Sequence, residues 1–290
     1  MQSVYLVSAM RSAIGTFGGA LKDVAPSELG AKVAKAAVAS AGIDSSAVEF
    51  SIFGQVISTD AKDPYLARVV ALDSGLSQAT PAITVNRLCG SGMQAVIQGA
   101  NLIQLGEVDV VLAGGAECMS RAPHQTQDVR WGRKMGQIRM SDMLEEGLKD
   151  PFHAYLMGVT AENVARAYQV DRPTQDALAL ESHRRASKAI REGRFAEQIV
   201  PIDVVSRRAT RTFAEDEHVR HDAEPNDLEK LRAVFDSEGT VTAGNSSGIN
   251  DGAAAVVLAS ERAVRTHGRA RRPDGADWQD GGRPGGGPAD

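Results

Sequence analysis

The 290-residue sequence has few aromatic residues, few cysteines and no strong imbalance of charge. Aromatic side chains make up 4% of the residues against 42% hydrophobic residues, so a core must be built mainly from Ala, Val, Leu and Ile. The formal net charge of -5 argues against a nucleic acid or a membrane surface as the main partner. No apolar run is long enough to span a bilayer, and no signal peptide or basic leader is recognisable. These absences predict a cytoplasmic protein.

The two cysteines, Cys89 and Cys118, match no metal-ligand spacing. They are also too few for a disulfide framework, which indicates a reducing compartment. The sequence therefore predicts no metal site, and the interest of the cysteines lies in their reactivity.

Short apolar runs alternate with helical periodicity over the first 118 residues, which predicts a mostly parallel α/β sheet. One helix is expected to start near Pro26, with Ser27 as its cap and Gly42 at its end. A run at 253–258 reads as a last strand that completes this sheet. The expected earlier strands are 4–7, 51–57, 82–85 and 108–113, the last ending at Gly114-Gly115.

Residues 119 to about 240 are richer in Arg, His, Met and charge. One helix is expected to begin at Thr160. Another should run from an Asp171 cap to about Arg191 and close at Gly193, with Pro173 in its first turn. The pattern predicts a mainly helical segment between two parts of the sheet.

Cys89 lies between the predicted strand 82–85 and a helix that begins near Met93. A helix N-terminus favours negative charge, and thiols at such positions ionise more readily and react faster as nucleophiles. Gly90 and Gly92 leave room for a substrate to approach the backbone. The same pattern also fits a buried, inert cysteine at a tight turn.

The segment Asn86 to Ala95 resembles the acyl-enzyme segment of thiolases, the acyl-CoA:acyl-CoA C-acetyltransferases. Further blocks are similar to thiolase blocks and occur in the family's order, and the resemblance runs from residue 1 to about residue 267. These blocks are Arg11-Ser12-Ala13-Ile14-Gly15-Thr16-Phe17-Gly18-Gly19, Gly114-Gly115-Ala116-Glu117, Met157-Gly158-Val159-Thr160-Ala161-Glu162-Asn163 and Val241-Thr242-Ala243-Gly244-Asn245-Ser246-Ser247-Gly248-Ile249-Asn250-Asp251-Gly252-Ala253-Ala254.

The resemblance implies one half of a five-layer αβαβα thiolase fold, with an inserted, mainly helical loop domain. Residues 1–118 and 250–260 would form the N-terminal core, and 119–249 the loop domain that covers coenzyme A and carries the tetramer contact. The second half of the fold is expected to be missing. Residues 268–290 are dominated by Gly, Pro, Arg and Asp, so they are expected to be a disordered tail. A shifted reading frame near Gly268 would explain that tail.

By resemblance, Cys89 is the nucleophile that accepts the acyl group, and its own backbone N–H is one donor of an oxyanion hole. Ser247 matches the serine that contacts the pantetheine arm of coenzyme A, and Arg220 matches the basic residue near the adenosine end. His183 and Met157 fall at positions that line the coenzyme A groove. The alternative for these positions is a surface arginine or a core methionine. Acyl-CoA is thus implied as substrate, with no permanently bound cofactor.

The family's acid/base groups are absent from the sequence, because no Asn-Glu-Ala-Phe, Gly-His-Pro or Cys-x-Gly segment of the family's second half occurs. The resemblance implies condensation of two acetyl-CoA to acetoacetyl-CoA, or the reverse thiolysis, and this chain is expected to be impaired or inactive in turnover. A homotetramer, or association with an intact thiolase, is implied. Arg130-Trp131-Gly132 lies in the expected tetramer contact. Leu156 stands where some members have His.

Two alternatives remain open from the sequence. One is a non-catalytic fragment that binds coenzyme A or assembles with an intact thiolase. The other is a serine hydrolase using Ser246, because Gly244 to Gly248 fits the Gly-x-Ser-x-Gly pattern, with Asp251 and His267 following in the required order.

Overall fold

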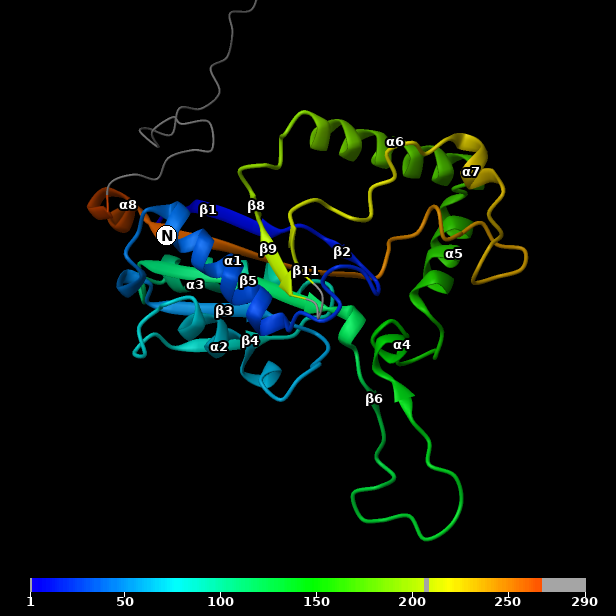
Figure 1. Cartoon of the computed structure of the whole chain (residues 1–290), viewed down its shortest axis with the longest axis horizontal. Coiled ribbons are helices and arrows are strands. Elements are labelled where there is room, and N and C mark those ends of the chain that lie inside the picture. The colour runs from blue at the N-terminus through cyan, green and yellow to red at the C-terminus, as the bar shows by residue number, and fades with distance from the viewer. Residues whose placement is uncertain (1, 206–208, 268–290) are drawn as a thin grey trace, which may run out of the picture.

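The computed structural model describes residues 2–205 and 209–267. Within that part of the chain, seven strands form one central sheet in the order β4-β3-β5-β11-β1-β8, with β2 paired to β11 (Figure 1). The predicted α/β fold is confirmed. The strands of this sheet are β1 (Val4–Ser12), β2 (Gly15–Thr16), β3 (Phe50–Gly54), β4 (Ala82–Val85), β5 (Val110–Cys118), β8 (Ile199–Val200) and β11 (Asn250–Ser260).

The sheet is mixed rather than mostly parallel. β3 runs parallel to β4 and to β5, as the alternation of strands and helices predicts. However, β11 lies antiparallel to β5 on one side and to β1 on the other. It returns from the long segment 119–249 rather than from a short crossover helix, so nothing forces it to be parallel. The predicted strand 253–258 is therefore confirmed as β11, but it lies at the centre of the sheet.

Several strand ends differ from the sequence prediction. β1 continues past the expected end at Val7 and reaches Ser12. β3 stops at Gly54, three residues before the expected end. β5 continues through the two glycines that were expected to end it, and reaches Cys118. The absence of a side chain at Gly114 is what permits this, because a Cβ there would lie 2.3 Å from the carbonyl oxygen of Ala254 on β11.

Helices cover both faces of the sheet. Along β3, Ile52 packs into one apolar cluster and Phe53 into the other, and neighbouring residues of a strand point to opposite faces. The larger cluster contains α1 (Pro26–Ala41) and α2 (Leu66–Asp73). The smaller cluster contains α3 (Ser91–Gln104), which therefore lies on the other face. Short 3-10 helices η1 (Ser45–Ala47) and η2 (Asp63–Tyr65) and the helix α8 (Glu261–His267) complete this region.

The helix α1 starts and ends as predicted, but its N-cap residue is a different one. Gly42 adopts a left-handed φ of 65° and closes the helix. The N-cap is Ala25, which makes no side-chain hydrogen bond, and Ser27 lies buried within the first turn. Pro26 at the start of the helix supplies the fixed φ and needs no partner for an N–H, so a capping side chain is dispensable there.

The outer side of α3 is apolar and exposed. Met93 is 65% exposed and Ile97 is 41% exposed, and Leu105 just after the helix is 73% exposed. The inner side of the same helix packs Ala95 and Ile103 against the sheet without any exposure. The helix therefore has apolar side chains both toward the sheet and toward solvent.

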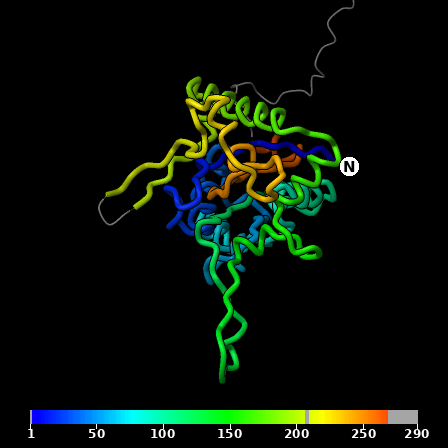
Figure 2. The backbone as a smooth tube through the Cα atoms, turned by 90° about the vertical axis from the view of Figure 1, so that its right-hand side faces the viewer, coloured from blue at the N-terminus to red at the C-terminus, as the bar shows by residue number. Residues whose placement is uncertain are grey.

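Residues 119–205 and 209–249, which we call the loop region, lie beside the sheet region formed by residues 2–118 and 250–267. The segment around β6 and β7 extends away from the rest of the molecule in both views (Figures 1 and 2). The elements of the loop region, apart from β8, are η3 (Met119–Arg121), β6 (His124–Gln125), β7 (Ser141–Asp142), α4 (Met143–Gly147), α5 (Met157–Tyr168), α6 (Arg172–Arg191), β9 (Ile202–Val205), β10 (Thr210–Phe213) and α7 (Pro225–Glu229).

The helix predictions for the loop region hold with one shift. Asp171 caps α6 by accepting a hydrogen bond from the Thr174 N–H, and Gly193 with a φ of 67° follows the end of the helix. α5 begins at Met157, three residues before the expected start. None of the helices in the described residues is long and apolar enough to cross a membrane. The predicted disordered tail, 268–290, lies outside the described residues.

Candidate functional site

Cys89 lies exposed on the turn between β4 and α3, immediately before Gly90, the N-cap of the helix. The strand before it is an exposed sheet edge rather than the buried strand suggested by its composition, because Ile83 is 46% exposed. The predicted position of the cysteine, directly before a helix N-terminus, is confirmed. The alternative of a buried, inert cysteine at this turn is wrong.

The turn is held in a strained shape. Leu88, directly before the cysteine, has a φ of 48°, in the left-handed region that costs a non-glycine residue free energy. The Ser91 hydroxyl donates to the Leu88 carbonyl at 2.6 Å and accepts from the Arg87 N–H at 2.8 Å. On the other side, the Asn86 side-chain oxygen accepts from the Leu88 N–H at 2.9 Å. These bonds fix the backbone that presents the thiol.

Glycines bring the start of α3 close to the sheet. A Cβ at Gly54, the last residue of β3, would lie 2.6 Å from the Ser91 carbonyl carbon. At Gly92, by contrast, an added Cβ would meet no atom within 4 Å, and this residue lines the cavity described next. The structure thus leaves open space at Gly92, where the sequence predicted room for a substrate.

Cys89 lies on the wall of a cavity of about 420 Å³, a size within the range of small-molecule sites. Its wall is mainly apolar. Two carboxylates, Glu117 and Asp251, also belong to the wall. The larger apolar side chains that line this cavity are those of Ile14, Val56, Ile57, Leu88, Met119 and Leu148.

Both carboxylates accept hydrogen bonds from backbone N–H groups. Glu117 accepts hydrogen bonds from the N–H groups of Val56 at 2.8 Å and Ile57 at 3.2 Å. Burial raises the pKa of Glu117, and this effect outweighs the two hydrogen bonds that lower it. Asp251 is fully buried, and one of its oxygens accepts from the Ser120 N–H at 2.9 Å. Its other oxygen has no hydrogen-bond partner among the described residues.

Cys118, the last residue of β5, differs from Cys89 in its exposure. It is fully buried, and burial raises its pKa to about 12, with the negative charge of Asp251 as the next cause. A buried thiol of this kind stays protonated and unreactive at neutral pH. Both cysteines are free thiols in the structure.

A second cavity, of about 860 Å³, adjoins the first, because Met119 and Leu148 line both. It contains two of the predicted site residues, Met157 and Ser247. Leu156, at the position where some thiolases have His, also lines it. The structure thus places Cys89 in one cavity, and Met157 and Ser247 in the cavity that adjoins it.

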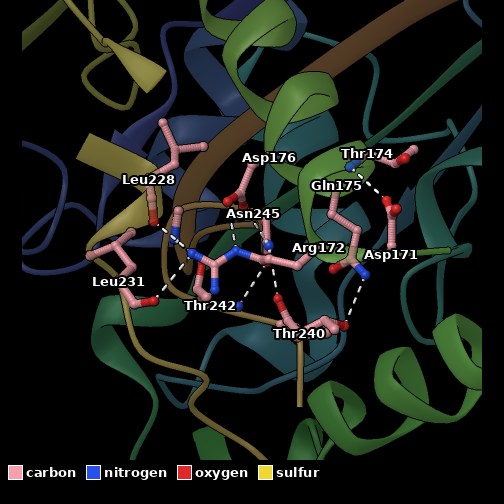
Figure 3. Close-up of polar contacts among 12 residues, drawn as sticks. Asp171, Arg172, Thr174, Gln175, Asp176, Leu228, Leu231, Thr240, Thr242 and Asn245 are labelled. Atoms are coloured by element: carbon pink, nitrogen blue, oxygen red, sulfur yellow. Dashed lines mark hydrogen bonds and ion pairs between the residues drawn. The ribbon is translucent and has the colours of Figure 1, made fainter. Parts of the chain in front are cut away.

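The loop that carries Ser247 is anchored by a polar network (Figure 3). Asn245 accepts from the Thr242 N–H at 2.7 Å and donates to Asp176 at 2.9 Å. Asp176 also accepts from Arg172 at 2.6 Å, and the same arginine donates to the carbonyls of Leu228 and Leu231. The network ties the loop to the first turns of α6.

His183 and Arg220 lie together but line neither cavity. The Arg220 N–H donates to Nδ1 of His183 at 3.2 Å. Burial lowers the pKa of His183, and the positive charges of His218 and Arg220 add to the effect. The structure therefore separates the predicted site into a cavity group and a second pair in the loop region.

Sequence reasoning assigned no role to Glu117, although the block that contains it was recognised, and missed Phe235 altogether. Phe235 lines the second cavity and packs on Gly158, where a Cβ would lie 2.2 Å from the ring. A glycine directly after Met157 was the available signal for a close neighbour. Glu117 gave no local signal, because its partners lie 60 and 61 residues away.

The geometry around Ser246 differs from a serine-hydrolase elbow. Its hydroxyl donates to the carbonyl of Thr242, and the strand β11 follows where an elbow needs a helix. Asp251 bonds to the Ser120 N–H, and His267 ends α8. Among the residues that the structure describes, no three His, Cys, Asp or Glu side chains gather as metal ligands.

Fold and site define a class of protein in which a mixed α/β sheet presents a cysteine at a helix N-terminus on the wall of a two-part cavity. The model of the thiolase N-terminal domain matches residues 4–262. The chain therefore belongs to the thiolase family, as its sequence blocks predicted.

The sequence is 55% identical over 258 residues to beta-ketothiolase BktB of Cupriavidus necator, covering 89% of this chain and 66% of that protein. It is 46% identical over 261 residues to an acetyl-CoA acetyltransferase of Rhizobium meliloti, with 89% and 66% covered. The chain thus spans about two thirds of the length of these relatives.

Solved structures agree with the sequence comparison. The Bacillus anthracis acetyl-CoA acetyltransferase superposes with a TM-score of 0.89 at 43% identity, covering 92% of this chain and 68% of that chain. Human mitochondrial 3-ketoacyl-CoA thiolase in complex with CoA gives a TM-score of 0.87 at 41% identity, with 92% and 66% covered. The predicted thiolase-like fold is confirmed over the matched part.

Proposed function

We propose that this chain accepts the acyl group of an acyl-CoA on Cys89. The observation that carries the proposal is the exposed thiol directly before α3, on the wall of a cavity that continues past Met157 and Ser247. A thioester substrate needs a nucleophile with access to solvent and an adjoining groove for its long arm, and both are present.

The chemistry is one exchange of thioesters. The sulfur of Cys89 attacks the carbonyl carbon of the acyl-CoA as a thiolate, and a new C–S bond forms. The bond from that carbon to the coenzyme A sulfur breaks, and coenzyme A leaves as a thiolate that takes a proton from water. The oxyanion of the intermediate would be stabilised by the backbone N–H of Cys89, a contribution of about 10²–10³ in rate for one such donor.

The coenzyme A arm is proposed to run along the second cavity. Ser247 and Met157 would contact the pantetheine part. His183 and Arg220 would lie near the adenosine end, where an arginine suits both phosphate and a stacked base. The proposal is supported by the human relative, whose structure was determined in complex with CoA.

Condensation of two acetyl-CoA to acetoacetyl-CoA, or the reverse thiolysis, is the reaction that the family assignment suggests. The 290 residues contain none of the Asn-Glu-Ala-Phe, Gly-His-Pro and Cys-x-Gly segments that would supply the family's acid/base groups. A general base contributes roughly 10²–10⁴-fold to such reactions. We therefore expect acyl capture by Cys89 without efficient turnover by this chain alone.

A second candidate function is a fragment that binds coenzyme A or assembles without catalysis. It is favoured by the exposed apolar side of α3, because a surface of that kind is typical of an interaction site. Association with an intact thiolase would use such a surface, whereas a homotetramer is proposed to form through the loop domain. The division into a core of 1–118 and 250–260 and a loop domain of 119–249 remains a proposal, as does the cytoplasmic location.

Incubation with acetyl-CoA tests the proposal, with the intact protein measured by mass spectrometry. We expect the mass of one acetyl group to appear on the chain and on a Cys118→Ser variant, and to be absent from a Cys89→Ser variant. Acetylation that persists in Cys89→Ser would overturn the proposal. A thiolysis assay with acetoacetyl-CoA separates the two functions, because turnover favours an enzyme and acetylation without turnover favours the fragment.

A further inference from the structure

Glu117 makes contacts that reach beyond its own strand. It is the residue before the end of β5 and lines the Cys89 cavity. Its two oxygens accept hydrogen bonds from the N–H groups of Val56 and Ile57, which lie just beyond the end of β3. Among the described residues, no other side chain of β5 is hydrogen-bonded to residues 55–57. The carboxylate therefore fixes the 55–57 backbone against the end of β5.

The bonds continue from that backbone to the turn of the nucleophile. The carbonyl oxygen of Val56 accepts from the side-chain amide of Asn86 at 3.2 Å. The oxygen of the same amide accepts from the Leu88 N–H at 2.9 Å. Because an amide group is planar and rigid, holding its nitrogen at Val56 also holds its oxygen at Leu88.

Leu88 is the residue that needs such support. Its φ of 48° is unfavourable for a leucine, and a residue persists in that region only where its surroundings hold it. The Leu88 side chain is 59% exposed, so packing contributes little to the restraint. The restraint comes from hydrogen bonds, those of Ser91 inside the helix and that of Asn86 outside it.

We infer that Glu117 is a positioning residue for Cys89, acting through Val56, Asn86 and the left-handed Leu88. The inference rests on the proposed function, in which Cys89 is the nucleophile. Glu117 does not touch the thiol in this chain of contacts. Its effect is to keep the turn in the conformation that places Cys89 on the cavity wall.

A carboxylate suits this task better than an amide. Both oxygens of Glu117 face N–H donors, and a glutamine offers one oxygen acceptor and one NH₂ group, which is itself a donor. Glu117→Gln should therefore lose one of the two bonds to the 55–57 segment while conserving size. This substitution weakens the chain of contacts at its first step.

The chain offers a matched control at the opposite end of β5. There Glu49, before β3, accepts from the N–H groups of Asp109 and Val110, at the start of β5. Like Glu117, Glu49 accepts hydrogen bonds from two successive backbone amides and links β3 to β5. Both amides donate to one oxygen of Glu49, so Glu49→Ala, which removes that oxygen, breaks the link at the far end of these strands from Cys89.

The experiment measures the second-order rate of iodoacetamide alkylation at Cys89 in the full chain, by peptide mapping. We expect Glu117→Gln and Asn86→Ala each to lower this rate roughly three- to tenfold, the effect of losing a hydrogen bond. The double variant should show no further loss, because both substitutions break one chain of contacts. Glu49→Ala should leave the rate unchanged.

A rescue variant separates positioning from general destabilisation. Glycine adopts the φ of Leu88 without cost, so Leu88→Gly should reduce the effect of Glu117→Gln to less than half of its size. Equal rates for Glu117→Gln and the unaltered chain would overturn the inference while leaving the proposed function intact. Fully additive losses in the double variant would also overturn it. Alkylation of Cys89 in the unaltered chain no faster than that of Cys118 would overturn the proposed function as well.

Discussion

The sheet region and the loop region are held together by different kinds of contact. Of the twelve largest fully buried side chains in the described residues, only Ile202 and Glu162 lie in the loop region, and one of these two is a carboxylate. The sheet region has a core of Leu, Ile, Val and Phe. The loop region instead depends on polar networks such as that of Asn245, Asp176 and Arg172. Cys89 is thus carried by a region held together by apolar packing, and the second cavity is lined largely by a region held together by hydrogen bonds.

The largest effect on stability is expected in the sheet region. Phe53 is fully buried, so Phe53→Ala should lower the free energy of unfolding by about 3–5 kcal/mol. Phe152 in the loop region is 88% exposed, and Phe152→Ala should change the free energy of unfolding by no more than about 0.5 kcal/mol. Urea unfolding followed by circular dichroism measures both. Similar losses for the two variants would contradict the contrast between the regions.

The loop region should respond most to the loss of its buried carboxylate. Glu162 is 1% exposed and accepts from the N–H groups of Thr240 and Val241 at 2.7–3.0 Å. Glu162→Ala leaves these donors without an acceptor and should cost roughly 2–4 kcal/mol in unfolding free energy. Glu162→Gln keeps one acceptor and should cost less. The two variants are compared in the same urea experiment, and a harmless Glu162→Ala would show that the carboxylate is not a support.

Acid should lower the local stability of the loop region before that of the sheet region. Burial alone would raise the pKa of Glu162, but hydrogen bonds from Val241 and Thr240 outweigh it, and the pKa falls below the ordinary 4.5. For Asp216 burial is likewise outweighed, here by Arg11 and the Ile14 N–H, and its pKa falls below 3.8. Stability from such groups is present above these ordinary values and is lost as the pH falls through the folded values.

Site-resolved hydrogen exchange, corrected for the intrinsic effect of pH on exchange rates, measures this difference between pH 7 and pH 3. We expect the amides of 240–241 in the loop region, and those of 13–16 where the sheet region contacts Asp216 of the loop region, to lose protection before those of β5. The pKa shift of Glu117 has the opposite sign to those of Glu162 and Asp216, because burial raises the pKa of Glu117. Protonation of Glu117 at low pH therefore removes an unfavourable buried charge. Loss of protection in β5 first would contradict the account.

The smallest effect is expected from an exposed ion pair. Glu28 and Lys32 on α1 form an i,i+4 pair whose side chains are 56% and 39% exposed. A double-mutant cycle should give a coupling energy of about 0.3–0.5 kcal/mol. Arg172 and Asp176 on α6 have the same spacing, but their side chains are 24% and 13% exposed and join the network of Asn245. Their coupling should reach about 1–3 kcal/mol, and equal couplings would show that the network adds nothing.

The sequence predicted features that depend on neighbouring residues. The strand Ala82–Val85, the turn at Cys89, the cap at Asp171 and the helix end at Gly42 all follow from local composition and were found as expected. These features are set by backbone conformations and caps within a few residues, which single-sequence patterns record. The cavity positions of Cys89, Met157 and Ser247 came from the resemblance to thiolases.

Features set by contacts distant in the sequence could not be predicted. The antiparallel course of β11 depends on where a chain of more than a hundred residues returns to the sheet. The burial of Glu162 depends on amides 78 and 79 residues away, and a glutamate on a helix face normally predicts exposure. The role of Glu117 depends in the same way on Val56 and Ile57. The polar supports of the site are therefore visible only in the folded chain.

The most direct test of the account compares iodoacetamide labelling of the two cysteines in the folded chain, with and without acetyl-CoA. The pKa of Cys118 is raised from 9.0 to about 12, which lowers its reactive thiolate fraction about 10³-fold at neutral pH, and burial shields it further. We predict that Cys89 is labelled far faster than Cys118, and that acetyl-CoA protects it. Equal labelling of the two thiols, or no protection by acetyl-CoA, would contradict the claim that Cys89 is the acyl acceptor.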